Sequence, residues 1–153
     1  MSGFAVYDFS CGPLRMVYED DALIGLEKAD TAVDAGVRTD ITELAAAQLA
    51  AYFSGKRQYF TVPYRFTKGT VFQRQVWDAL CEIPYGQTRS YQDIAVRIGR
   101  PKAVRAVGMA NHMNPLAILV PCHRVIGKNG GLTGYGGGLA MKKFLLDLER
   151  KYR

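Results

Sequence analysis

The feature that most constrains this chain is an apolar run that leads into a proline and a cysteine, residues 118–126 (ILVPCHRVI). The apolar residues before Pro121 predict a buried strand, which must end or deform there because proline has a fixed φ and no backbone N–H. Cys122 therefore follows directly on a rigid buried segment, from which its thiol can face a cleft. His123 and Arg124 come next, and a nearby base or positive charge is what turns a thiol into a nucleophilic thiolate.

The Cys122-His123 dipeptide by itself allows two interpretations. Neighbouring side chains on an extended chain point to opposite faces, so His123 reaches Cys122 only if the chain bends or a water bridges them. A buried and chemically inert cysteine is the more frequent outcome for such a pair. The motifs around the pair favour the reactive interpretation.

Several motifs surround the cysteine in a fixed order. The run PCHRV begins at Pro121, the pair Asn114-Pro115 precedes it, and a glycine-rich segment follows at residues 134–139 (GYGGGL). In this order and spacing the motifs resemble the active site of the O6-alkylguanine-DNA alkyltransferase family. The resemblance is dense over residues 66–149 and loose over the first 65 residues.

The resemblance implies a nucleophile, a base and an orienting acid. Cys122 would take an alkyl group by in-line displacement, His123 would accept the thiol proton through a water, and Glu149 would orient His123. From the residues alone, Glu149 has an alternative as a solvated side chain paired with Arg153, four residues on. A thioether does not leave readily, and no cofactor or regenerating thiol is visible, so each molecule is expected to act once.

The resemblance also assigns residues to DNA and to the rotated base. Tyr91 would help to rotate the nucleotide and donate a hydrogen bond to guanine, and Arg105 would fill the gap left in the base stack. Asn114 would act as the hinge between the DNA-binding helices and the active-site segment. These residues imply double-stranded DNA as the partner, bound through the minor groove with little sequence preference and strong salt dependence.

The guanine pocket is assigned, by the same resemblance, to Val125, Tyr135 and Gly136. The backbone of Cys122 and Val125 would read the exocyclic amine, and Tyr135 would form a wall. Some family members carry serine at the position of Gly136, so a hydroxyl contact is lost here. The open glycine loop is expected to admit alkyl groups larger than methyl.

The implied activity is direct reversal of DNA damage on O6-alkylguanine, and also on O4-alkylthymine, with the base flipped out of the duplex. The nearest alternative is a non-catalytic lesion-binding protein of the alkyltransferase-like group, which lacks the reactive cysteine that Cys122 supplies. A Cys-His hydrolase would leave Arg105 and Asn114 without a role. We expect a monomer, and a transcriptional regulator would need a second half-site that a monomer does not provide.

The residue pattern predicts an α+β fold with two domains, residues 1–65 and 66–153. Residues 4–28 predict an antiparallel meander, and Asp40 with Glu43 predicts a capping box that opens a helix ending at Gly55. The resemblance implies an RNase H-like fold for this first domain, which we interpret as a scaffold without catalytic residues.

The second domain is expected to be mainly helical, a winged helix-turn-helix. Capping boxes at Thr70 and Ser90 open two helices, and Pro101 suits the first position of a third. The helices that begin at Ser90 and Pro101 form the helix-turn-helix, and residues 139–152 form the last helix.

Composition bounds what remains. The net charge of +6 permits a polyanionic partner without requiring one. No run of about 18 apolar residues is present, so no membrane span is expected, and without a signal-peptide pattern the expected location is the cytoplasm. Three widely spaced cysteines predict no disulfide framework, and no paired Cys/His spacing predicts a metal site.

Overall fold

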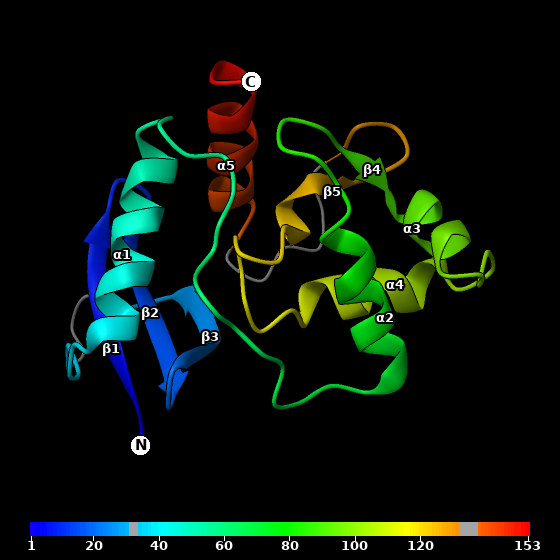
Figure 1. Cartoon of the computed structure of the whole chain (residues 1–153). Coiled ribbons are helices and arrows are strands. Elements are labelled where there is room, and N and C mark those ends of the chain that lie inside the picture. The colour runs from blue at the N-terminus through cyan, green and yellow to red at the C-terminus, as the bar shows by residue number, and fades with distance from the viewer. Residues whose placement is uncertain (31–33, 132–137) are drawn as a thin grey trace. The chain divides into compact units, whose positions relative to one another are not determined.

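A computed structural model describes residues 1–30, 34–131 and 138–153, and the chain forms two compact units, Met1–Thr67 and Lys68–Arg153. Both helices and strands are present, so the fold mixes helix and sheet (Figure 1). The boundary between the units lies two residues after the one that the sequence suggested. No described helix is long and apolar enough to cross a membrane.

The first unit is built on a three-stranded antiparallel sheet. Strands β1 (Ser2–Phe9), β2 (Gly12–Glu19) and β3 (Ala22–Lys28) pair in chain order, which confirms the predicted meander. Alternate residues of β2 are buried, as expected for a sheet with one covered face. In β3 the register shifts, which lets Leu23 and Leu26 both be buried although they are three residues apart.

Helix α1 (Asp40–Phe53) covers that face of the sheet (Figure 1). The prediction that Asp40 caps this helix was wrong, because Thr39 is the N-cap and its backbone N–H donates to Thr42 Oγ1 at 2.8 Å. Threonine at the third helical position thus makes the contact that was assigned to Glu43. The helix ends at Phe53 with Ser54 as its C-cap, and Gly55 follows with a φ of +79°, as predicted.

The second unit is mainly helical. Its helices are α2 (Val71–Leu80), α3 (Tyr91–Arg97), α4 (Val104–His112) and α5 (Leu139–Lys151). The predicted capping boxes are confirmed, because Thr70 Oγ1 accepts from Gln73 N at 3.1 Å and Ser90 Oγ accepts from Asp93 N at 3.0 Å. A short parallel pair, β4 (Arg89–Ser90) and β5 (Val125–Ile126), completes the unit.

The start of α4 was predicted wrongly. Pro101 lies in a turn rather than in the helix, because Ala103 N donates to Arg100 O at 2.9 Å and α4 begins only at Val104. The fixed φ of proline suits the second position of such a turn as well as it suits a helix start. The turn joins α3 to α4.

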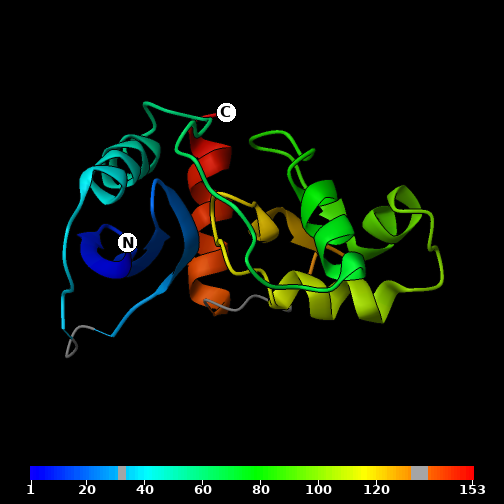
Figure 2. The same ribbon diagram turned by 60° about the horizontal axis from the view of Figure 1, so that its bottom comes forward.

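The core of the second unit lies where α2 and α4 meet. Trp77 of α2 is buried, and its indole N–H donates to Ala110 O of α4 at 2.8 Å. Both views show α2 against α4, and the short turn that contains Cys122 lies between α2 and α5 (Figures 1 and 2). The reactive segment is therefore held by helices distant in sequence.

Candidate active site

The segment before Pro121 is buried as predicted, but it is not a strand. It forms a tight turn in which Val120 N donates to Leu116 O at 2.9 Å, and Ile118 has a φ of +73°. A β-branched residue is rare in that left-handed region, where the conformation costs about 1–2 kcal/mol. The surrounding core must hold it there, because Ile118 is only 1% exposed.

The side chain of Asn114 satisfies the polar groups of this turn. Its Nδ2 donates to Val120 O at 2.8 Å, and its Oδ1 accepts from Leu116 N at 3.0 Å. An amide side chain thus replaces the neighbouring strand that a buried extended segment would require. This contact links the end of α4 to the residues just before the cysteine.

Directly after Pro121 the chain bends into a single 3₁₀ turn, η1 (Cys122–Arg124), in which Arg124 N donates to Pro121 O at 3.0 Å. Cys122 is 4% exposed, His123 is fully buried and Arg124 is 8% exposed. The chain therefore bends at the Cys122-His123 pair instead of running on as an extended strand. The structure describes all three cysteines, and none of them forms a disulfide.

Glu149 of α5 lies at the centre of a buried charge network. His123 Nε2 lies 2.6 Å from its Oε2, and Arg124 donates from Nε to Oε1 at 2.8 Å and from Nη2 to Oε2 at 3.0 Å. Gly86 N donates to Oε1 at 3.1 Å. The alternative pairing with Arg153 is wrong, because Glu149 is only 1% exposed and Arg153 donates to Gly86 O.

The protonation states of this network follow from its contacts. Burial alone would raise the pKa of Glu149, but the hydrogen bonds and charges of His123 and Arg124 outweigh it and hold that pKa well below its usual range. Burial lowers the pKa of His123, although Glu149 acts in the opposite direction. A charged carboxylate beside a neutral imidazole places the proton on Nε2. His123 Nδ1 is then an acceptor, and it makes no hydrogen bond with any described residue.

Lys142 of α5 is a site residue that the sequence analysis missed. Its side chain is fully buried, and burial lowers its pKa to about 8, while the charge of Cys122 acts to raise it. Its Nζ lies 5.8 Å from the centre of the Tyr91 ring. Lys142 is thus a buried cation whose charge interacts with that of Cys122, whereas the charge of Arg124 is matched by Glu149. One signal was available: Lys142 and Glu149 are seven residues apart, hence on one face of a helix.

The remaining predicted residues lie at different places in the second unit. Tyr91 begins α3, and its ring faces Gly108 of α4, where an added Cβ would lie 3.8 Å from the ring. Arg105 is exposed on α4, and Val125 is fully buried directly after η1. The structure thus brings Tyr91 close to Lys142. The predicted pocket residues Tyr135 and Gly136 lie outside the described residues.

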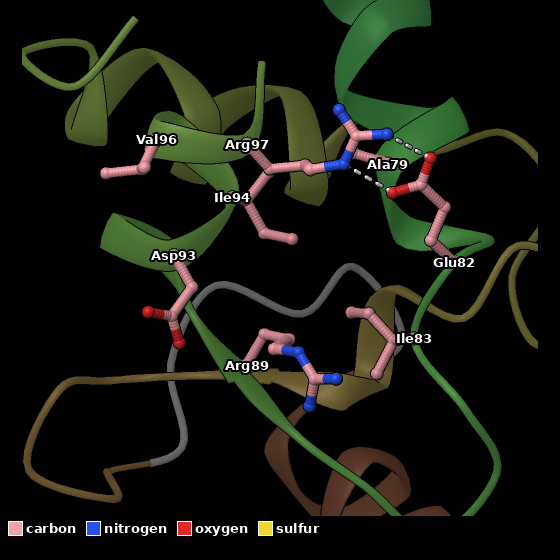
Figure 3. A pocket seen from close by; sticks show the side chains of 8 residues that line it. All are labelled: Ala79, Glu82, Ile83, Arg89, Asp93, Ile94, Val96 and Arg97. Carbon is pink, nitrogen blue, oxygen red and sulfur yellow. Dashed lines mark hydrogen bonds and ion pairs between the residues drawn. The ribbon is translucent and has the colours of Figure 1, made fainter. Parts of the chain in front are cut away.

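A separate hollow of about 560 Å³ opens beside α2 and α3 (Figure 3). Its lining residues are Ala79, Glu82, Ile83, Arg89, Asp93, Ile94, Val96 and Arg97. Arg97 and Glu82 form a two-bond ion pair at its edge, at 2.7 and 2.8 Å, and both side chains are more than half exposed. The hollow contains no predicted site residue. Over the described ranges, no three His, Cys, Asp or Glu side chains gather to hold a metal ion.

Comparison with known proteins gives matches over both units. The family model described as 6-O-methylguanine DNA methyltransferase, DNA binding domain, matches residues 71–151. A methylated-DNA–protein-cysteine methyltransferase of Methanosarcina barkeri is 62% identical over 105 residues, which are 69% of this chain and 66% of the relative. The protein of the same name from Methanosarcina acetivorans is 46% identical over 95% of this chain and 97% of its own.

A solved structure agrees with these sequence matches. The crystal structure of Mycobacterium tuberculosis OGT in complex with DNA superimposes with a TM-score of 0.86 and 44% sequence identity. The match covers 97% of this chain and 93% of that one. The chain belongs to the 6-O-methylguanine DNA methyltransferase family.

Proposed function

We propose that the protein repairs O6-alkylguanine in double-stranded DNA by moving the alkyl group onto the sulfur of Cys122, once per molecule. The observation that carries this proposal is the buried contact of 2.6 Å between His123 and Glu149. His123 directly follows Cys122, whose charge interacts with that of the buried Lys142. This arrangement supplies a nucleophile, a base and a cation in one place. The same chemistry extends the proposal to O4-alkylthymine.

The reaction balances with these groups. The thiol proton passes through a water to His123 Nδ1, the atom with no other partner among the described residues. The thiolate then attacks the alkyl carbon, so that a sulfur–carbon bond forms as the carbon–oxygen bond to the base breaks. Tyr91 donates a hydrogen bond to the departing guanine anion, which takes up a proton from water and leaves as a neutral base, while His123 returns the thiol proton to water. The alkyl group stays on the protein as a thioether.

We assign DNA binding to α3 and α4, because a short turn joins these two helices, as in a helix-turn-helix motif. We propose that this unit is a winged helix-turn-helix and that the first unit is an RNase H-like scaffold. A lesion inside a duplex cannot meet a thiol that is 4% exposed, so the base must leave the stack. The relative from Mycobacterium tuberculosis has been solved in complex with DNA, and the family model that matches residues 71–151 is described as a DNA binding domain, which supports DNA as the partner of the second unit.

The first test is the intact mass of the protein after incubation with a duplex that holds one O6-methylguanine. The expected result is a gain of one methyl group per molecule, found on the peptide that contains Cys122, and no gain in a Cys122→Ser control. A protein that binds the lesion tightly without gaining mass would contradict the proposal. That result would support the lesion-binding alternative.

Arg105 gives a separate test of the DNA contact. Because Arg105 is exposed on α4, an Arg105→Ala variant is expected to slow transfer from a duplex by about 10-fold, equivalent to ~1.4 kcal/mol. Its reaction with the free base O6-benzylguanine should be unchanged. Arg150→Ala, which removes an exposed arginine of α5, is the matched control. An equal loss of rate on duplex and free base would rule out a DNA-specific role.

A further inference from the structure

Asn111 connects helix α4 directly to the candidate nucleophile. It lies in the last turn of α4, is 1% exposed, and its Nδ2 donates to Cys122 O at 3.3 Å. The backbone of the preceding residue is held in place by the hydrogen bond from Trp77 to Ala110 O. The amide group therefore reaches the peptide of Cys122 from a rigid position.

The other atom of this amide argues against a purely structural role. Asn111 Oδ1 is buried and makes no hydrogen bond with any described residue. Turning the amide over would place its oxygen against Cys122 O, so the hydrogen bond settles the orientation. A buried acceptor without a donor costs about 1–3 kcal/mol. For stability alone, an apolar side chain of similar size would serve better at this position.

Gln48 shows what a structural buried amide looks like in the same chain. It is 6% exposed, and its Nε2 donates to Thr61 Oγ1 at 2.6 Å. Its Oε1 accepts from Thr61 N at 2.9 Å and from Val62 N at 3.2 Å. Both ends of this amide are satisfied, whereas only one end of the Asn111 amide is.

The contact of Asn111 also has a counterpart on the other side of Pro121. Asn114 donates to Val120 O, so two amides at the end of α4 hold the carbonyl groups that flank this proline. The same helix exposes Arg105, the residue assigned to the base stack. The helix that we expect to contact DNA is thus joined to the peptide group of Cys122 by one buried hydrogen bond, from Asn111.

We propose that Asn111 is a positioning residue that orients Cys122 relative to the DNA-binding helix, a role that rests on the proposed alkyl transfer. It does not touch the lesion, because it is buried in the unit core. It acts by restricting the orientation of the Cys122 peptide group. The sulfur is then held in line with the bond between the alkyl carbon and the base oxygen, as in-line displacement needs. The buried Oδ1 atom without a donor lowers the stability of the fold, and the restraint on Cys122 accounts for keeping an asparagine at this position.

The test measures single-turnover rates of Asn111→Leu against increasing concentrations of a duplex that holds O6-methylguanine. We expect the limiting rate to fall by about 10- to 100-fold, the range for a slightly misplaced reacting group. The half-saturating duplex concentration should not rise, and the midpoint of denaturant unfolding should not fall. Asn111→Asp keeps the shape and removes the donor, so its limiting rate should fall as well.

Gln48→Leu is the matched control, since it removes a fully bonded amide and should lower stability without changing the limiting rate. A wild-type limiting rate in Asn111→Leu would overturn the inference, as would a loss confined to duplex affinity or accounted for by unfolding. In each of these cases wild-type protein still gains the methyl group. Absence of transfer in wild-type protein would instead overturn the proposed function, and the role of Asn111 with it.

Discussion

A Glu149→Gln variant is expected to lose roughly 10²- to 10⁴-fold in the limiting rate of alkyl transfer, by analogy with loss of the orienting acid in other triads. The carboxylate holds the proton of His123 on Nε2, which leaves Nδ1 free as the base. A glutamine amide can instead donate to Nε2. The histidine would then carry its proton on Nδ1, where it cannot accept one from the thiol.

The same substitution is expected to lower the free energy of unfolding by about 3–5 kcal/mol, because it leaves a buried arginine charge without its partner. Arg124 donates two hydrogen bonds to Glu149 and a third to Ile83 O at 2.7 Å, so it cannot turn to solvent. The matched control is Glu82→Gln. That glutamate makes the same two-bond contact with Arg97, but in an exposed pair worth about 0–1 kcal/mol.

The stability effect of Glu149 has a defined pH dependence. Because its pKa is lowered on folding, Glu149 stabilises the fold fully above the ordinary glutamate value of about 4.3. This contribution is lost as pH falls through the folded value. Urea unfolding at several pH values should therefore show that the difference in free energy of unfolding between wild type and Glu149→Gln becomes smaller below about pH 4. A gap that is constant with pH would contradict the assigned charge.

A Lys142→Met variant is expected to be more stable than wild type at neutral pH but about 10-fold or more slower in alkyl transfer, since a nearby opposite charge shifts an ionisation by about 1–3 pKa units. The pKa of Lys142 is about 8, lowered from the ordinary lysine value by burial. Below that pH the folded protein carries a buried ammonium at a cost in stability. The same ammonium favours the thiolate of Cys122.

The pH profile separates these two effects. Between about 8 and 10.4 the unfolded chain binds a proton that the folded chain does not, so wild-type stability rises with pH and the advantage of Lys142→Met shrinks. The rate deficit of the variant should also shrink as wild-type Lys142 loses its charge. Lys143→Met is the matched control, because Lys143 is exposed and pairs with Asp147. A rate ratio that does not change with pH would rule out the charge effect.

Local signals in the sequence predicted local structure well. Ser90 and Asp93 cap α3 as expected, and so do Thr70 and Gln73 for α2, because a capping box joins residues only three apart. The meander was readable for a similar reason, since neighbouring strands with short turns pair with each other. The wrong start at Pro101 came from a residue that suits two local structures equally.

The apolar run before the cysteine shows the limit of pattern reading. Burial of that segment was predicted, but its conformation was not, because the side chain of Asn114 supplies the hydrogen bonds that were expected from a neighbouring strand. No periodicity in a short apolar run distinguishes a buried turn from a buried strand. The distinction depends on which polar group is available nearby in space.

The sequence by itself determined the family, the identity of Cys122, His123 and Glu149 as candidates, and most helix starts, because these depend on residue order and short spacings. Only the tertiary structure decided which charges meet. It paired Arg124 with Glu149 and buried Lys142 where its charge interacts with that of Cys122. It also joined Asn111 to the peptide of Cys122. The physical reason is that a buried polar group acts on whatever the packing of distant segments places beside it, and low dielectric makes those contacts strong.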